Sequence, residues 1–211
     1  MLQYFIDGGP LMWLLLLCSI IEFAVIIDRF KAFKNADRDI VKLKEMVIDN
    51  LAQNRLDGAV ECCFACGGPV AAVLLSGLKR LKRMQTLDLP RSEMVLGVGK
   101  SMEDFAPHVL ESMEKRLGLL PIIASIAPLL GMTGTVTGMI SSFDAMAQAA
   151  SLDGSAVSAG ISEALITTAG GLLFAMPAYI AYNIFSKKLD RLAMDTESAA
   201  NELVDFIALQ K

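Results

Sequence analysis

Positively charged residues are missing from two long stretches of this sequence. No lysine or arginine precedes Arg29, and none lies between Arg116 and Lys187, so all 19 basic residues fall within 29–116 and 187–211. A soluble fold does not normally exclude every cation from a block this long, whereas two membrane spans and the loop between them do. The distribution therefore predicts a membrane protein.

Signatures of several functional classes are also missing. The sequence contains a single histidine, His108, and neither a glycine-rich phosphate loop nor a catalytic triad is visible. The net charge of −4 and the pI near 5.1 argue against a protein that binds nucleic acid. We therefore expect no enzyme, no cofactor and no nucleic-acid partner.

Three apolar runs are each long enough to supply the roughly 20 helical residues that cross a bilayer. They cover about Pro10–Ile27, Leu117–Phe143 and Ile161–Phe185, in a chain that is 54% hydrophobic with a mean hydropathy of +0.51. The first run lacks both a preceding basic segment and a small-residue cleavage site, so we interpret it as a retained span. No strand-like alternation appears. The sequence predicts an all-α integral membrane protein with three transmembrane helices, of which helices two and three extend into the cytoplasm.

The basic residues flank the spans on one side only. Arg29 and Lys31 follow the first span, Lys115 and Arg116 precede the second, and Lys187 follows the third. By the positive-inside rule these flanks are cytoplasmic. The amino terminus is therefore predicted to be periplasmic and the carboxyl terminus cytoplasmic.

This topology divides the chain into four parts. Residues 1–30 form an N-terminal periplasmic segment and transmembrane helix 1, and 31–116 form a cytoplasmic helical domain. Residues 117–186 hold transmembrane helices 2 and 3 with a short periplasmic loop, and 187–211 form a cytoplasmic C-terminal helix.

Within the cytoplasmic domain, apolar periodicity over 36–57 and 70–84 predicts two helices. From Glu93 the helical pattern runs straight into the second span. A cysteine cluster lies between the two predicted helices, in a compartment that keeps thiols reduced. It lacks a fourth zinc ligand at a suitable spacing, so we interpret Cys62, Cys63 and Cys66 as small buried residues and expect no metal.

Small residues form a stripe along one face of the second span and another along the third. Stripes of this kind let helix backbones approach closely, and packing alone can account for the glycines. A proline inside each span removes one helix hydrogen bond and is expected to kink the helix. In the functional interpretation the stripes pack around a central pore and leave room for a further helix. The stripe residues are Gly131, Gly134 and Gly138 in the second span and Ala164, Gly171 and Ala175 in the third, and the prolines are Pro128 and Pro177.

Polar side chains accompany these apolar stripes. Counted from the span ends, Thr135 and Thr168 lie at similar depth, and Glu163 lies roughly 7 Å further out at 1.5 Å per residue. Together they would form a polar track with a carboxylate at its mouth. Thr167 remains an alternative to Thr168, because it is the residue below Glu163 on the helix. The structural alternatives are a back-bond from Thr135 to its own helix and an interfacial position for Glu163.

The second and third spans resemble the MotA/TolQ/ExbB proton channel family. The residues that carry the resemblance are 126–140 with Phe143 in the second span, and 163–172, 175–178 and 182–183 in the third. Three spans rather than four favour the ExbB/TolQ branch. The resemblance implies that Thr135 and Thr168 are the channel threonines and that Glu163 is the third-span glutamate.

The resemblance further implies a homo-oligomeric ring, a pentamer, in the bacterial inner membrane. The ring would surround an ExbD- or TolR-like single-span partner whose aspartate carries protons, with a TonB- or TolA-like protein as a further partner and membrane lipid around it. Two rival functions remain open. One is a non-conducting membrane scaffold, and the other is a small-solute secondary transporter in which Pro177 marks a broken helix.

Three positions stand out beside the family pattern. Thr137 occupies a position where many members carry an aromatic residue, and Asp28 stands where a glutamate commonly precedes Arg29. Glu22 lies two-thirds of the way along the first span. Pairing of Glu22 with Arg29 and pairing with another subunit are both open interpretations.

Overall fold

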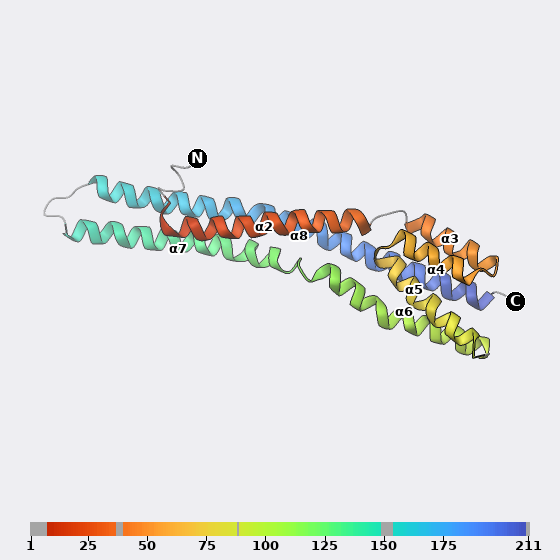
Figure 1. The fold of residues 1–211 in the computed structure, drawn as a ribbon. Helices are drawn as coiled ribbons and strands as arrows, with labels where there is room; N and C mark the ends of the chain where they lie inside the picture. The colour runs from red at the N-terminus through yellow and green to blue at the C-terminus, as the bar shows by residue number, and fades with distance from the viewer. Residues whose placement is uncertain (1–7, 37–39, 88, 149–153, 210–211) are drawn as a thin grey trace. The chain divides into compact units, whose positions relative to one another are not determined.

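The chain is helical throughout the residues that the computed structural model describes, which are 8–36, 40–87, 89–148 and 154–209. No strand occurs within these ranges, as the sequence predicted. The helices follow one another along the chain in the order drawn in Figure 1. They are α2 (Gly9–Ala36), α3 (Ile40–Ala52), α4 (Leu56–Cys66), α5 (Gly68–Gln85), α6 (Arg91–Glu114), α7 (Leu119–Gln148) and α8 (Gly154–Leu209).

The chain forms two compact units. The first, called the span unit below, comprises Met1–Arg29 and Arg116–Ile184. The second unit comprises Phe30–Lys115 and Phe185–Lys211. Helices α2 and α8 each contribute residues to both units.

In the span unit, α2, α7 and the first part of α8 lie side by side (Figure 1). Within the described residues, three helical segments are long and apolar enough to cross a membrane. Large apolar side chains such as Trp13, Leu129 and Leu173 point outward and are more than half exposed. An outward-facing apolar surface around three long helices is typical of lipid-facing spans. The protein is therefore a multi-pass membrane protein with three transmembrane helices.

The helix expected to run unbroken from Glu93 into the second span is interrupted. Helix α6 ends at Glu114 and α7 begins at Leu119, with turn residues between them. Pro121 has no N–H with which to bond the carbonyl of Leu117. That carbonyl instead accepts a hydrogen bond from the N–H of Leu120 at 3.0 Å. The proline thus favours a tight turn where apolar periodicity alone predicted a continuous helix.

The third span continues without interruption into the carboxyl-terminal segment as α8. Pro177 lies inside α8 and Pro128 inside α7, and each helix continues beyond its proline. Both prolines had been expected to kink their helices; the helix is continuous through each, and the kinks stay predictions.

The second unit packs α3 to α6 and the end of α8 around an apolar core. Leu43, Val47 and Leu51 form the buried face of α3, as their periodicity predicted. Gly67 and Gly68 adopt positive φ angles of 64° and 87°, which glycine tolerates without steric cost. They allow the chain to reverse between α4 and α5. Further buried members of this core are Ala59, Cys63, Leu74, Leu78, Val98, Met102, Leu192, Leu203 and Ile207.

The cysteines of α4 are free thiols. Burial, and then the neighbouring Cys62 and Cys66, raises the pKa of the Cys63 thiol to about 12. Cys62 and Cys66 are half-buried. Among the described residues, no three histidine, cysteine, aspartate or glutamate side chains are placed to hold a metal ion.

Candidate functional site: hydroxyl groups between α7 and α8

Helices α7 and α8 make backbone-to-backbone contact along their small-residue stripes. A Cβ at Gly171 would lie 2.5 Å from the carbonyl oxygen of Ala127, closer than any Cβ packs. A Cβ at Gly131 would lie 3.0 Å from the Cα of Thr168. The glycines therefore set how close the two helices come, as small residues do between membrane helices.

Thr168 bridges the two helices at this contact. Its hydroxyl donates a hydrogen bond to the carbonyl oxygen of Gly131 at 2.8 Å, and the side chain is partly buried. No Cβ at Gly131 stands between the hydroxyl and this carbonyl, so the threonine reaches backbone rather than a side chain. A hydroxyl both donates and accepts hydrogen bonds, so Thr168 is a polar junction between α7 and α8.

Thr167 points toward the start of α2. Its side chain is 1% exposed. The hydroxyl lies 2.8 Å from the carbonyl oxygen of Gly8 and 2.9 Å from that of Glu163. The hydroxyls of the two threonines, between which helix geometry alone did not choose, thus bond to different segments: that of Thr168 to α7 and that of Thr167 to the residue before α2. The methyl group of Thr167 also packs against Gly134 of α7.

Glu163 lies beside the first residue of α2. A Cβ at Gly9 would overlap the Oε1 of Glu163, so the carboxylate occupies the space that a side chain at Gly9 would fill. Gly9 also has a φ of +70°, in the left-handed region that favours glycine. Two independent constraints therefore require glycine here. Glu163, Thr167 and the Gly8–Gly9 segment form one polar cluster at this end of the span unit.

Thr135 does not take part in that cluster. Its hydroxyl donates to the carbonyl oxygen of Met132 at 2.6 Å, within its own helix. This is the back-bonded alternative considered from the sequence. Thr168 packs against Gly131, four residues before Thr135, so the two hydroxyls are offset by about one helical turn, or roughly 6 Å.

Sequence reasoning missed Gly8 and Gly9. Both precede Pro10, and a proline in the first helical turn is a recognised start signal for a helix. That signal could have placed the beginning of α2, but it could not have placed this segment against Glu163 and Thr167, which lie more than 150 residues away. The contact depends on the axial register of α2 against α8.

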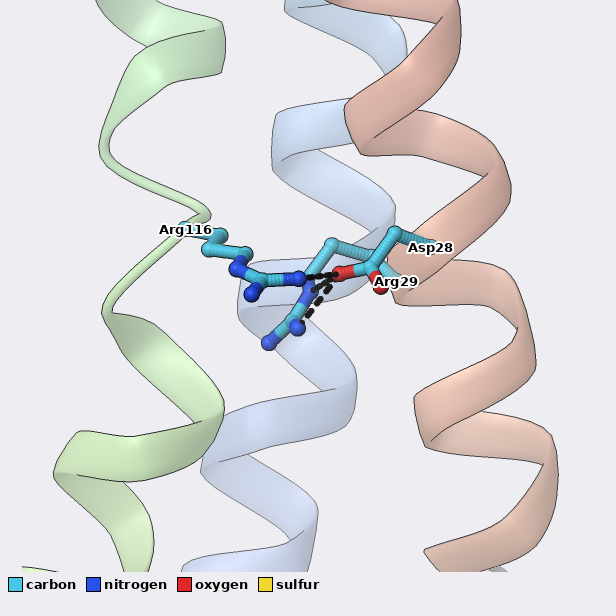
Figure 2. A network of polar contacts seen from close by, with 3 residues as sticks. All are labelled: Asp28, Arg29 and Arg116. Carbon is cyan, nitrogen blue, oxygen red and sulfur yellow. Dashed lines mark hydrogen bonds and ion pairs between the residues drawn. The ribbon is translucent and has the colours of Figure 1, made fainter.

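A second polar group lies at the opposite end of the span unit. The Oδ2 of Asp28 accepts hydrogen bonds from the Nε and Nη2 of Arg29 at 3.1 and 2.6 Å and from the Nη1 of Arg116 at 3.1 Å (Figure 2). These bonds, first those of Arg29 and then that of Arg116, lower the pKa of Asp28. The cluster joins α2 to the turn that precedes α7.

An open cavity of about 320 Å³ lies on the surface of α7 and α8. Its walls are almost wholly apolar and contain one of the small positions named from the sequence, Ala175. The other lining residues are Ala124, Leu172, Met176, Tyr179 and Ile180. Of the other small positions named from the sequence, Ala164 is buried and contacts Gly138. The small residues thus both close the helix contact and leave a hollow beside it.

Comparison with known proteins gives the same family that the span motifs suggested. Residues 68–198 match the MotA/TolQ/ExbB proton channel family. The Tol-Pal system protein TolQ of Haemophilus influenzae is 30% identical over 194 residues, which cover 91% of this chain and 85% of TolQ. The biopolymer transport protein ExbB of Neisseria meningitidis serogroup A is 27% identical over 198 residues, which cover 90% of this chain and 87% of that ExbB.

The matched region includes α7 and most of α8, and therefore Glu163 and the three threonines Thr135, Thr167 and Thr168. Relatives named TolQ and ExbB align over most of the chain. This family is one of proton channels and is not a class of enzymes. The chain belongs to the MotA/TolQ/ExbB proton channel family.

Proposed function

We propose that this chain is the ring subunit of an ExbB/TolQ-type motor in a bacterial inner membrane. The motor would couple proton motive force to mechanical work through an ExbD/TolR-like single-span partner. Family membership and the relatives named TolQ and ExbB support the class of motor. The basic flanks of the spans support an amino terminus in the periplasm and a carboxyl terminus in the cytoplasm. The Glu163 end of the span unit is then periplasmic.

The observation that carries this proposal is the hydrogen bond from Thr168 to Gly131. It places a hydroxyl, which can both receive and pass on a hydrogen bond, at a close backbone contact between two apolar helices. A contact needed only for packing would be served equally well by valine, which has the same shape as threonine. The polar atom at this point therefore supports a role in proton movement.

Along the proposed route, a proton enters from the periplasm beside Glu163. The hydroxyls of Thr167 and Thr168 follow on α8, and that of Thr135 lies one turn away on α7. These groups would offer hydrogen-bonding partners to the ionised aspartate of the partner protein. Each charge that crosses yields about 2.3 kcal/mol per 100 mV of membrane potential, so no nucleotide is needed as fuel.

The partner requires a surface against which a helix can slide. The apolar cavity beside Ala124 and Ala175 offers one on α7 and α8. In a ring of five copies, an arrangement implied by the family, five such surfaces would face a shared axis. A TonB- or TolA-like protein would then receive the work.

The decisive experiment replaces Thr168 with valine and measures proton-driven work in cells that contain the partner protein. Valine keeps the shape and removes the hydroxyl, so we expect normal assembly of the ring and loss of most of the work. The matched control is Thr133→Val, because Thr133 is exposed and its hydroxyl bonds only to the carbonyl of Leu129 in its own helix.

Three results would count against the proposal. Full work in Thr168→Val would favour the non-conducting scaffold. Uptake of a small solute by the chain without any partner would favour the secondary transporter. Equal loss in Thr168→Val and Thr133→Val would show a general defect of the span unit and would remove the support for the route.

A further inference from the structure

Glu22 is a carboxylate buried inside the span unit. It lies on α2 with an exposed fraction of 0%. Neither of its carboxylate oxygens has a hydrogen-bond partner within the described structure. The burial arises within a single copy of the chain, so no second subunit is needed to cover this side chain.

The face of α2 that carries Glu22 is the face that packs inward. Leu15, Ser19, Val25 and Arg29 recur on it at intervals of three or four residues and are all buried. Leu15 belongs to an apolar cluster that also contains Ala127 of α7 and Ala175 of α8. Glu22 therefore points into the bundle rather than toward lipid.

Across the described parts of the chain, no hydrogen bond from a basic side chain neutralises Glu22. On its own helix Arg29 lies seven residues on, about 10 Å along the axis, and its guanidinium is bound by Asp28, which also binds Arg116. Cys18, four residues before Glu22, is half-buried. Pairing with Arg29, one of the two interpretations left open by the sequence, is not formed.

The neighbouring helices α7 and α8 contribute few ionisable side chains to the span unit that could interact with Glu22. In α7 the one ionisable residue is Asp144, which is exposed. In α8 up to Ile184 the ionisable residues are Glu163, the exposed Tyr179 and the half-buried Tyr182. Glu163 lies at Gly9, thirteen residues before Glu22 along α2 and thus about 20 Å away. Glu22 is therefore separate from the Glu163–Thr167 cluster.

An ionised carboxylate without a partner is strongly disfavoured in an apolar interior, whereas a neutral carboxylic acid is tolerated much better. We propose that Glu22 is a proton-binding site, occupied while α2 packs against α7 and α8 and emptied when α2 separates from them and admits water. On binding, the Glu22 carboxylate takes a proton from hydronium and becomes a carboxylic acid, leaving water; release is the reverse. Ser19 lies one turn away on the same buried face.

Proton binding at Glu22 is then linked to helix packing. The packed state holds one more proton than the separated state. Its stability therefore decreases as the pH rises, since the separated state is the one that gains from ionisation. This inference stands apart from the proposed motor function, because it concerns the chain alone and requires no partner and no proton flux.

Infrared spectroscopy of the purified full-length chain in lipid nanodiscs tests the site directly. We expect the C=O stretching band of a protonated carboxylic acid at neutral pH. The band should be lost in Glu22→Gln, shifted in Glu22→Asp and retained in Glu163→Gln. Absence of the band from the wild-type protein, or its persistence unchanged in Glu22→Gln, would overturn the proposal.

Thermal unfolding of the same samples tests the linkage. As the pH is raised, the unfolding midpoint of the wild-type protein should fall relative to that of Glu22→Gln by several degrees, because glutamine has the same size and cannot ionise. Midpoints that run parallel over the whole range would overturn the linkage. If Glu22→Gln does not assemble, wild type is compared with Glu22→Asp at each pH instead. We then expect the infrared band to disappear reversibly at high pH. A spectrum that does not change with pH would be the contrary result.

Discussion

The hydroxyl of Thr168 donates to the carbonyl oxygen of Gly131 on the neighbouring helix, 2.8 Å away. In a regular α-helix the same carbonyl accepts the backbone N–H of the residue four positions on, which here is Thr135. Thr168 is therefore connected to the backbone of Thr135 through one shared acceptor. The two threonines that the family resemblance selects are linked in this way although their hydroxyls do not meet.

The close contact of α7 and α8 predicts that Gly171 will not accept even one extra carbon. In Gly171→Ala the new Cβ would lie 2.5 Å from a backbone oxygen of α7, which cannot move independently of the helix. We expect a loss of about 1–3 kcal/mol, the usual cost of overpacking, measured by thermal or denaturant unfolding in detergent. The control is Gly118→Ala, whose Cβ meets nothing within 4 Å. Similar losses in both variants would argue against a tight contact.

A substitution at Gly9 is predicted to destabilise the start of α2 in a similar way. A control at Gly67 separates the clash with Glu163 from the cost of a positive φ angle. Both Gly9→Ala and Gly67→Ala place a Cβ on a backbone with positive φ, at 70° and 64°, which costs about 1–2 kcal/mol. Only Gly9→Ala also displaces the carboxylate of Glu163, because nothing lies within 4 Å of the Cβ position at Gly67. We expect Gly9→Ala to destabilise the protein more than Gly67→Ala in unfolding experiments. The reverse order would contradict the contact with Glu163.

The hydrogen bonds of Asp28 to two arginines predict that the folded protein loses stability in acid. Arg29 and Arg116 hold the pKa of this carboxyl below its usual range, so its contribution is complete above the unfolded pKa, about 3.9. The contribution is lost as the pH falls through the lower folded pKa. The gap in unfolding midpoint between wild type and Asp28→Asn should therefore narrow as the pH drops below about 4. Asp144→Asn, at an exposed position without these arginines, serves as the control substitution.

Cys63 should be the least reactive of the clustered thiols. Burial raises its pKa to about 12, and only the thiolate reacts with alkylating reagents. We expect variants that retain one of the three cysteines to be alkylated most slowly when that residue is Cys63, with Cys62 and Cys66 faster because they are half-buried. Mass spectrometry over a time course measures the three rates. Fastest labelling at Cys63 would show that the α4 face is open.

Much of the helical content could be predicted from the sequence because single-helix properties determine it. Hydrophobic length located the three spans, and periodicity located the buried face of α3 with Leu43, Val47 and Leu51. Each of these predictions follows from residues within one element.

The features that the sequence did not provide depend on more than one element. A helical wheel gives the direction of a side chain but not the axial register between two helices, so it could not pair Thr168 with Gly131 instead of Thr135. The contact of Gly8 with Thr167 depends likewise on how α2 slides along α8. The turn before α7 was missed because the proline at position 121 acts on a carbonyl four residues earlier.

The single hydrogen of the Thr167 hydroxyl has a consequence for motion. Two carbonyl oxygens, of Gly8 and of Glu163, lie within bonding distance of it, and one hydrogen can point fully at only one of them. When the hydrogen points at Gly8, the hydrogen bond links the start of α2 to α8. When it points at Glu163, the hydrogen bond lies within α8 and the link to α2 is lost. Rotation about one C–O bond, without any displacement of the backbone, therefore switches the hydroxyl between a hydrogen bond that links the two helices and one that does not.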